Sequence, residues 1–193
     1  SDVCSSDLVK NSAYRASKVI DTLLTFSRSS DLESKVVDIR AVIDVAVSLL
    51  QNSAESSNIV INRHIGKHDY TVAGNSLVLE QVFFNLIKNS IDAMPKGGEI
   101  NIKAGVKKSK SKSKDNDLIV IEVQDNGVGI NDKDIPQVFD PFFTTKDPGQ
   151  GTGLGLSTVY LIVERHQGTI KVKSSPGQGT TFTITLPATG NNN

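Results

Sequence analysis

A helix that is apolar around most of its circumference constrains this fold more than any other feature of the sequence. Residues 77–94 have a helical period, and Pro95 and Gly97 stop the helix. At about 100° per residue, the polar side chains fall in one stripe and apolar side chains cover the rest. The stripe consists of Gln81, Asn85, Lys88, Asn89 and Asp92. Such a helix has to pack against other elements on several sides, so it belongs to the core of a layered domain.

Segments on both sides of this helix predict strands, some because apolar and polar residues alternate and others because they are short and apolar. The expected strands span residues 36–39, 59–65, 70–73, 99–106, 118–125, 169–174 and 180–186, and further helices span 41–50, 131–138 and 156–166. Asn75 is placed to cap the 77–94 helix, and Gly168 is placed to end the 156–166 helix. Strand pairs mixed with helices predict an α+β fold: a two-layer α/β sandwich whose mixed sheet is covered on one face by helices.

The composition excludes several classes of protein. The 193 residues suit one domain with an appendage, and no apolar run is long enough to span a membrane. With 21 basic and 21 acidic side chains, no net charge attracts nucleic acid or a membrane surface. One cysteine excludes an internal disulfide framework and a multi-cysteine zinc site. The lysine-serine run over 107–114 is expected to be a solvated loop, with a nucleic-acid contact as the alternative.

The two ends of the chain carry separate expectations. Residues 1–8 resemble the in-frame translation of a sequencing-adaptor end, which predicts that they are not native; an unstructured native start is the alternative. Residues 9–28 have the period of an amphipathic helix, whose apolar stripe needs partner helices. We therefore expect a non-native segment over 1–8, a helical remnant over 9–30, one domain over 36–188 and a disordered tail over 189–193.

Two segments place polar groups where a ligand can use them. The helical stripe holds two asparagines one turn apart, although asparagine is a poor helix former. A solvated face would explain them, but amide oxygens beside a carboxylate also suit a hard cation such as Mg²⁺. The segment 125–130 places the carboxylate of Asp125 at a strand end, before two glycines that let the backbone approach a ligand closely. This carboxylate can accept a hydrogen bond from an exocyclic amine, although an ordinary turn has the same sequence.

A third segment, residues 149–155, has glycine at every second position directly before the predicted 156–166 helix. The exposed N–H groups of such a loop and the partial positive charge of a helix N-terminus suit phosphate, with a flexible loop as the alternative. The spacing fits neither the dinucleotide-binding pattern nor the Walker pattern.

In this order, the three segments resemble the ATP-binding domain of sensor histidine kinases, in the superfamily shared with gyrase-type ATPases, heat-shock-90 chaperones and mismatch-repair MutL proteins. The resemblance covers residues 36–187: residues 80–93 resemble the N box, 125–130 the G1 box, 139–146 the F box and 151–156 the G2 box. The F box and the ending over 179–187 favour the histidine kinases over the other branches. The resemblance implies a Bergerat-type fold preceded by one long helix.

The resemblance also implies roles for individual residues. It makes Asn89 the Mg²⁺ ligand, with Asn85 as the second candidate, and it directs Asp125 to the adenine amine, supported by Thr180 through water. The glycines that would shape the adenine pocket are Gly127 and Gly129, and those that would wrap the phosphates are Gly151, Gly153 and Gly155. The residues expected in a mobile lid are Thr144, Thr145 and Lys146. The other residues expected to bind ATP are Lys88, Asp92, Ile130, Phe142, Thr152, Leu154 and Leu156.

The implied activity is transfer of the γ-phosphoryl group of Mg-ATP to a histidine, for relay to the receiver domain of a response regulator. In the family that histidine lies on the first helix of a dimerising hairpin. Residues 9–28 resemble the second helix, and His64, His68 and His166 lie elsewhere, so we expect ATP binding without self-phosphorylation. Asn85 stands where gyrase-type enzymes have a water-activating glutamate, so efficient hydrolysis is not expected.

The resemblance further implies a homodimer and a cytoplasmic domain, whether or not the full-length protein is anchored in a membrane. No contact with nucleic acid is expected, and none with a membrane within this stretch. The alternatives are a catalytically inactive nucleotide-binding module and a gyrase-type or MutL-type ATPase.

Overall fold

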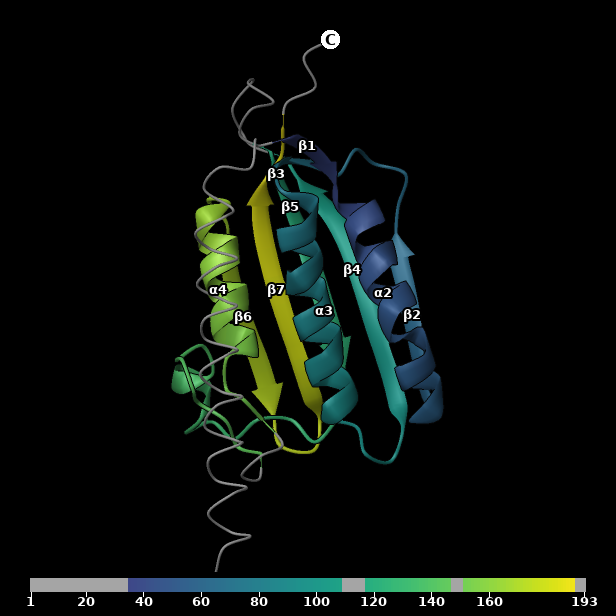
Figure 1. Cartoon of the computed structure of the whole chain (residues 1–193), viewed down its shortest axis with the longest axis vertical. Helices are drawn as coiled ribbons and strands as arrows, with labels where there is room; N and C mark the ends of the chain where they lie inside the picture. Colours follow the sequence, from purple (N-terminus) through teal and green to yellow (C-terminus); the bar gives the residue numbers. More distant parts are fainter. Residues whose placement is uncertain (1–34, 109–116, 147–150, 190–193) are drawn as a thin grey trace, which may run out of the picture.

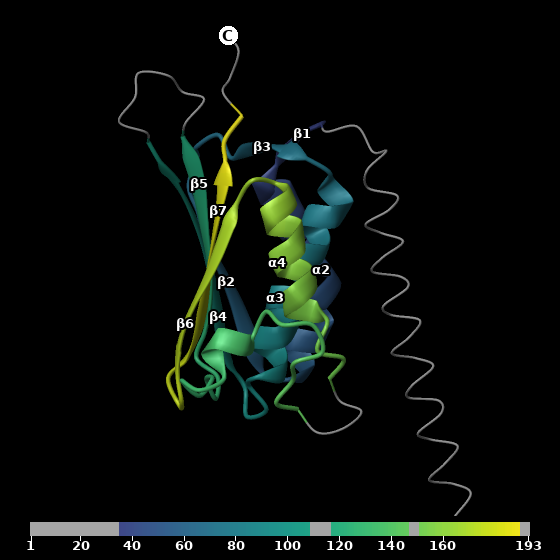
Figure 2. The same ribbon diagram turned by 90° about the vertical axis from the view of Figure 1, so that its left-hand side faces the viewer.

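The domain consists of two layers, a five-stranded sheet and three helices that cover one of its faces (Figures 1 and 2). The computed structural model describes residues 35–108, 117–146 and 151–189. The helices are α2 (Ile39–Ser56), α3 (Ser76–Asp92) and α4 (Gly155–Arg165). The strands are β1 (Lys35–Asp38), β2 (Ile59–Ile65), β3 (Thr71–Gly74), β4 (Gly98–Lys107), β5 (Leu118–Asp125), β6 (Thr169–Ser175) and β7 (Gly179–Pro187). The predicted two-layer α+β sandwich is therefore confirmed.

The sheet is mixed, as predicted. Its strand order is β2-β4-β5-β7-β6, in which β2 and β4 are parallel and every other neighbouring pair is antiparallel. β5 is the central strand, and its last residue Asp125 pairs with Ile100 of β4 and Thr180 of β7. β1 and β3 form a separate two-stranded antiparallel sheet at the other end of the molecule (Figure 1).

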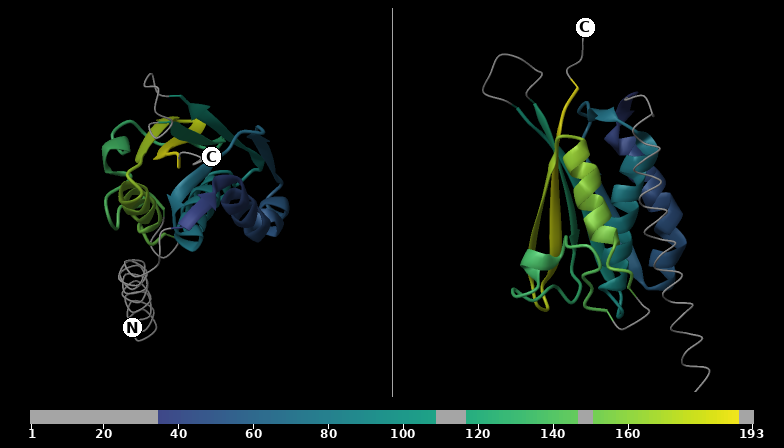
Figure 3. Two further views of the ribbon diagram at one scale, coloured as in Figure 1. Left: turned by 90° about the horizontal axis from the view of Figure 1, so that it is seen from above. Right: turned by 60° about the vertical axis from the view of Figure 1, so that its left-hand side comes forward.

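The core lies between the two layers, and α3 is the middle helix, flanked by α2 and α4 (Figures 1 and 3). Phe83, Leu86 and Ile87 of α3 have no exposed surface. The buried residues that the sheet turns toward the helices include Ile100, Ile102, Ile119, Ile121, Val123, Phe182, Ile184 and Leu186. Burying one such side chain contributes about 1.5–3 kcal/mol. α3 is covered on most sides and its polar stripe stays accessible, as its sequence predicted, but two apolar residues outside the stripe, Leu77 and Phe84, are exposed as well.

Three details differ from the prediction. α2 runs six residues beyond the predicted end at Leu50, through a polar last turn in which Ala54 is buried. Residues 131–138 form turns and the short 3₁₀ helix Ile135–Gln137 instead of an α-helix, because Pro136 lacks the N–H group that a helical ladder needs. Gly168 does not hold the left-handed position after α4, where Gln167 has φ 55°. The N–H of Gly168 instead donates to the carbonyl of Val163, one position later in the capping motif.

Other predictions fall on residues that the structure does not describe. These are the segment 1–8, the helix over 9–28, residues 109–114 of the lysine-serine run and residues 190–193 of the tail. Thr189, the first residue of the predicted tail, is described, and its N–H donates to the carbonyl of Thr71 at 2.9 Å. Within the described ranges, no helix is long and apolar enough to cross a membrane.

The turn between β6 and β7 gives a test of how tightly the sheet packs around Asp125. Gly177 and Gly179 both have positive φ, 75° and 89°. A Cβ atom at Gly179 would lie 2.0 Å from the carbonyl oxygen of Asp125, whereas one at Gly177 would meet nothing within 4 Å. We expect Gly177→Ala to lower the free energy of unfolding by about 1–2 kcal/mol, the cost of a left-handed alanine.

We expect Gly179→Ala to lower the free energy of unfolding by about 2 kcal/mol more than Gly177→Ala does, because backbone atoms of β5 and β7 have to separate. Urea unfolding of the two variants measures the difference. Equal costs would show that β7 does not approach β5 as closely as the structure has it.

Candidate nucleotide-binding site

The predicted site residues gather at one end of the domain. The last turn of α3, the end of β5 and the start of α4 all lie at the lower end of Figure 1, together with the connection between β5 and α4. Because the side chains come from segments far apart in the sequence, the fold itself brings the three predicted segments together.

Asp125 ends β5 with a buried carboxylate, 4% exposed. Its Oδ1 accepts hydrogen bonds from the backbone N–H of Gly127 (3.0 Å) and of Thr180 (3.1 Å). Its Oδ2 accepts one from the hydroxyl of Ser90 on α3 (3.0 Å), a residue that is 1% exposed. Burial raises the pKa of Asp125, and the bonds from Gly127, Ser90 and Thr180 act against that rise.

These bonds leave Asp125 with acceptor capacity to spare. An ionised carboxylate offers about four lone-pair sites, and three donors occupy it here. All three donors point at the carboxylate, so one more donor would complete its set. An exocyclic amine has the required N–H group, which is what the predicted role in adenine binding needs.

Ser174 fixes the turn after β5. Its hydroxyl accepts from the backbone N–H of Ile130 (2.8 Å), donates to the carbonyl of Gly179 (2.9 Å) and lies 2.9 Å from the hydroxyl of Thr180. The N–H of Val128 donates to the carbonyl of Ala93, which follows α3. The turn is therefore held between the end of α3 and the β6–β7 turn.

Both glycines of this turn are needed for close approach. A Cβ at Gly127 would lie 2.6 Å from the carbonyl of Ala93, and one at Gly129 would lie 2.1 Å from the carbonyl of Ser175. These contacts are with the protein's own backbone, at the end of α3 and in the β6–β7 turn, and the close approach of the two glycines to a ligand stays a prediction.

The asparagines of α3 face the start of α4. The side-chain amide of Asn85 donates to the carbonyl of Gly155 (3.3 Å). A Cβ at Gly155 would have Asn85 Cγ and Asn89 Nδ2 as its nearest neighbours, both at 3.9 Å. No side chain caps α4 at Leu154, so its first-turn N–H groups point toward this region without a side-chain partner. An anion placed there meets the positive end of the helix dipole and two amides.

The segment before α4 is hydrogen-bonded to the loop over 139–146. The N–H of Phe142 donates to the carbonyl of Gly153 (2.9 Å), and both residues have φ of 67°. The hydroxyl of Thr144 accepts from the N–H of Lys146 (3.2 Å), and a Cβ at Gly151 would lie 2.5 Å from that hydroxyl oxygen. The predicted F-box and G2-box residues are therefore in contact.

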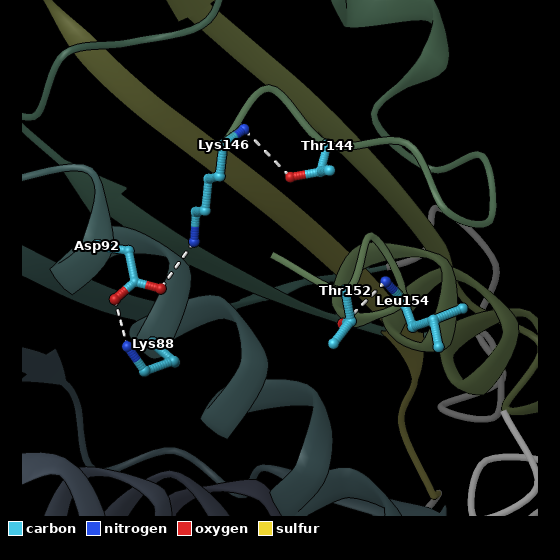
Figure 4. Close-up of polar contacts among 6 residues, drawn as sticks. All are labelled: Lys88, Asp92, Thr144, Lys146, Thr152 and Leu154. Carbon is cyan, nitrogen blue, oxygen red and sulfur yellow. Dashed lines mark hydrogen bonds and ion pairs between the residues drawn. The ribbon is translucent and has the colours of Figure 1, made fainter. Parts of the chain in front are cut away.

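Three charged residues connect this loop to α3 (Figure 4). Asp92 receives Lys146 on Oδ2 at 2.7 Å and Lys88, one helical turn before it, on Oδ1. Burial opposes ionisation of Asp92, but the hydrogen bonds and charges of Lys146 and Lys88 outweigh it and lower its pKa. Figure 4 also shows the hydroxyl of Thr152, which accepts from the N–H of Leu154 at 3.4 Å.

Two predicted residues lie less centrally. Thr145 is exposed in the loop, and Leu156 is partly buried and packs against the core. The structure also adds two residues that the sequence did not single out, Ser90 and Ser174. Their partners lie 35 positions away, at Asp125, and 44 positions away, at Ile130, so no local pattern indicated them.

The buried carboxylate predicts a dependence of stability on pH. The pKa of Asp125 is raised in the folded state, so folding favours the protonated carboxyl. The stability gained from this protonation is fully present below the unfolded pKa near 3.8 and is lost as pH rises through the folded pKa. Asp125→Asn keeps an acceptor for the two backbone donors but carries no charge. We expect this variant to melt at a higher temperature than the parent at pH 7, and the gap should close toward pH 4. A lower melting temperature at pH 7 would contradict the assignment.

The hydroxyl of Ser90 should stabilise the fold most when Asp125 is ionised. Ser90→Ala removes a bond to a charged group, which costs about 1.5–3 kcal/mol, and we expect that cost at pH 7 and a smaller one near pH 4. Ser157→Ala is the matched control, since its buried hydroxyl donates to the neutral carbonyl of Leu154 at 3.0 Å. Its cost should be about 0.5–1.5 kcal/mol at both pH values. Unfolding by urea at the two pH values compares them.

Comparison with known proteins shows the family of the chain. Residues 74–190 match the family model described as histidine kinase-, DNA gyrase B-, and HSP90-like ATPase. The chain is 37% identical to the sensor kinase CckA of Brucella abortus over 187 residues, which are 93% of the chain and 20% of CckA. It is 34% identical to sporulation kinase C of Bacillus subtilis over 182 residues, 94% of the chain and 40% of that kinase. The chain thus spans a fifth to two fifths of the length of these relatives.

A solved structure shows the same arrangement of elements. The catalytic domain of histidine kinase ThkA, in a nucleotide-free form, has a TM-score of 0.69 and 27% sequence identity, covering 81% of this chain and 96% of that one. ThkA in complex with the response regulator protein TrrA has a TM-score of 0.71 at 24% identity, covering 96% of this chain and 51% of that one. At this identity the similarity shows a shared fold and nothing more. The chain is similar to sensor and sporulation kinases and to the catalytic domain of a histidine kinase, and it belongs to the histidine kinase-, DNA gyrase B- and HSP90-like ATPase family.

Proposed function

We propose that this chain binds ATP together with Mg²⁺ and transfers the γ-phosphoryl group to a histidine of a helical hairpin. The observation that carries the proposal is the juxtaposition of Asp125, a buried carboxylate with one acceptor site left, with the asparagines of α3 and the uncapped start of α4. A base, a metal and phosphates have different chemistry, and one end of this domain offers a group suited to each.

Adenine recognition would rest on Asp125. Its remaining acceptor site would take the exocyclic amine, and the hydroxyl of Thr180, 2.9 Å from Ser174, would reach the base through water. Guanine presents a carbonyl at the same place, which would face the carboxylate without a proton between them. Asp125 thereby favours adenine over guanine.

The phosphates would lie at the start of α4, against the N–H groups of residues 151–156 and the ammonium of Lys146. The metal would be held by Asn89, with Asn85 as a second ligand. The donor set fits Mg²⁺, which takes oxygen ligands and keeps several waters and phosphate oxygens. Within the described residues no three His, Cys, Asp or Glu side chains gather, so phosphate oxygens and water would complete the coordination. When bound, Mg²⁺ neutralises charge on the phosphates during transfer.

Asn85 favours phosphoryl transfer to a protein over hydrolysis of ATP. A ring nitrogen of the acceptor histidine attacks the γ-phosphorus, the bond from that phosphorus to the bridging oxygen breaks, and ADP leaves with the bond electrons. Asn85, one turn before Asn89, is an amide and cannot take a proton from water. Water in the site is therefore poorly activated, and positioning by this chain decides which nucleophile reacts.

The wider setting follows from the relatives. We propose that the acceptor histidine passes its phosphoryl group to the receiver domain of a response regulator, that the hairpin pairs two copies into a homodimer, and that the domain works in the cytoplasm, where ATP is available. The kinase names of the relatives favour this function over the gyrase-type ATPase and the inactive module.

Calorimetry with a non-hydrolysable ATP analogue and Mg²⁺ tests the binding site. Asp125→Asn should weaken binding roughly tenfold or more, since a bond to a charged group is worth about 1.5–3 kcal/mol. Asn89→Ala should bind the analogue with Mg²⁺ no better than without it. The matched control is Asn62→Ala, which removes a half-buried asparagine from the uncovered face of the sheet. If Asp125→Asn and Asn89→Ala both bind like the parent, the assignment is wrong.

Phosphoryl transfer is tested by supplying a separate hairpin that carries a histidine. With labelled ATP, we expect acid-labile, alkali-stable label on the hairpin, and none when its histidine is replaced by glutamine. The chain incubated alone should stay unlabelled and should release phosphate slowly. Steady release of phosphate without transfer would instead assign the chain to the ATPases.

A further inference from the structure

Two lysines converge on one carboxylate beside the asparagine stripe. Lys88 comes from α3 itself, and Lys146 comes from the loop over 139–146, 54 positions after Asp92. The Lys146 ammonium lies 2.7 Å from Asp92 Oδ2, and the Asp92 side chain is 27% exposed (Figure 4). One cation would neutralise Asp92, so the cluster keeps a net positive charge at the end of α3.

The place of Asp92 is unfavourable for an anion. It is the last residue of α3, where the helix dipole presents its negative end. Burial also opposes its ionisation, and only the two lysines lower its pKa. At this position the carboxylate of Asp92 does not stabilise α3. Its favourable interactions are the two contacts with Lys88 and Lys146.

Lys146 spans the two sides of the proposed phosphate region. Its N–H is bonded to Thr144, and its Cβ and Cδ would lie 3.4 Å from a Cβ at Gly151. The side chain thus runs along the glycine segment before α4 and ends at α3, one turn from Asn89. Asn89 in turn lies beside the start of α4, where a Cβ at Gly155 would be 3.9 Å from its Nδ2, so the end of α3 lies between the Lys146 ammonium and the proposed phosphate region.

We propose that Asp92 is a positioning residue that holds Lys146 beside the asparagines and releases it to the terminal phosphates when the nucleotide binds. This inference rests on the proposed function. An ion pair this exposed contributes little to stability, so a polyphosphate with several negative charges can displace the carboxylate. Lys146 then binds phosphate, and the loop and glycine segment that it touches are fixed against α3.

Calorimetry with adenosine, ADP and the non-hydrolysable ATP analogue, all with Mg²⁺, separates this inference from the proposed function. Binding of adenosine by the parent chain establishes the base site; no binding of any of the three would remove the proposed function itself. Lys146→Met should weaken the analogue about five- to tenfold and leave adenosine unchanged, whereas Lys146→Arg should keep most of the affinity. Lys171→Met, an exposed lysine of β6, is the control for loss of one charge.

The decisive measurement is Asp92→Asn in three backgrounds. In Asp92→Asn the carboxylate no longer competes with phosphate for Lys146. We expect this variant to bind the analogue two- to fivefold more tightly than the parent and to bind adenosine equally well. The gain should be retained with Lys88→Met and lost with Lys146→Met, while thermal melts confirm that each variant folds. An equal gain in all backgrounds would reduce Asp92 to a repelling charge and overturn the proposal. Weaker binding by Asp92→Asn would overturn it too, because the carboxylate would then itself hold the metal or nucleotide.

Discussion

The buried carboxylate of Asp125 is the constraint on which this end of the structure depends. A carboxylate that is 4% exposed needs donors in place of water, and they come from α3, from β7 and from the turn after β5. The bond from Thr180 requires β5 and β7 to pair in one register, and the bond from Gly127 requires the chain to fold back after β5. The close approach of Gly179 to the Asp125 carbonyl follows from the same pairing. Strand register and glycine positions are thus tied to one charge.

α3 joins the parts of the site because its residues point in several directions. Ser90 faces the sheet and reaches Asp125, Asn85 faces α4, and Asp92 faces the loop over 139–146. The helix can do this because the neighbouring layers bury most of its apolar side chains and fix its rotation. A one-residue change in its register would move all three groups by about 100° and separate them from their partners.

The sequence predicted elements best where one periodic pattern runs to the end of the element. The bounds of β2 and β5 agree with the prediction, and in β5 every second residue is buried up to Asp125. The prediction failed where a helix continues beyond its apolar pattern, as in the polar last turn of α2. It also failed where one residue prevents the predicted element, as Pro136 prevents an α-helix over 131–138. In the site, types and spacing indicated Asp125 and the asparagines. Ser90 and Ser174 were not predictable, because their partners are set by packing between layers and not by neighbours in the sequence.

The two halves of the site differ in how they are held. Around Asp125, backbone bonds, a buried hydroxyl and close glycine contacts leave little freedom, so a base would meet a preformed acceptor. Around Lys146 and residues 151–154, the contacts are an exposed ion pair, a hydroxyl turn and two left-handed residues. Ordering such a segment costs entropy, and charge on the phosphates can offset that cost. Adenosine and a triphosphate therefore probe different physical properties of one site: the first reports the rigid acceptor, and the second reports how the loop responds to charge.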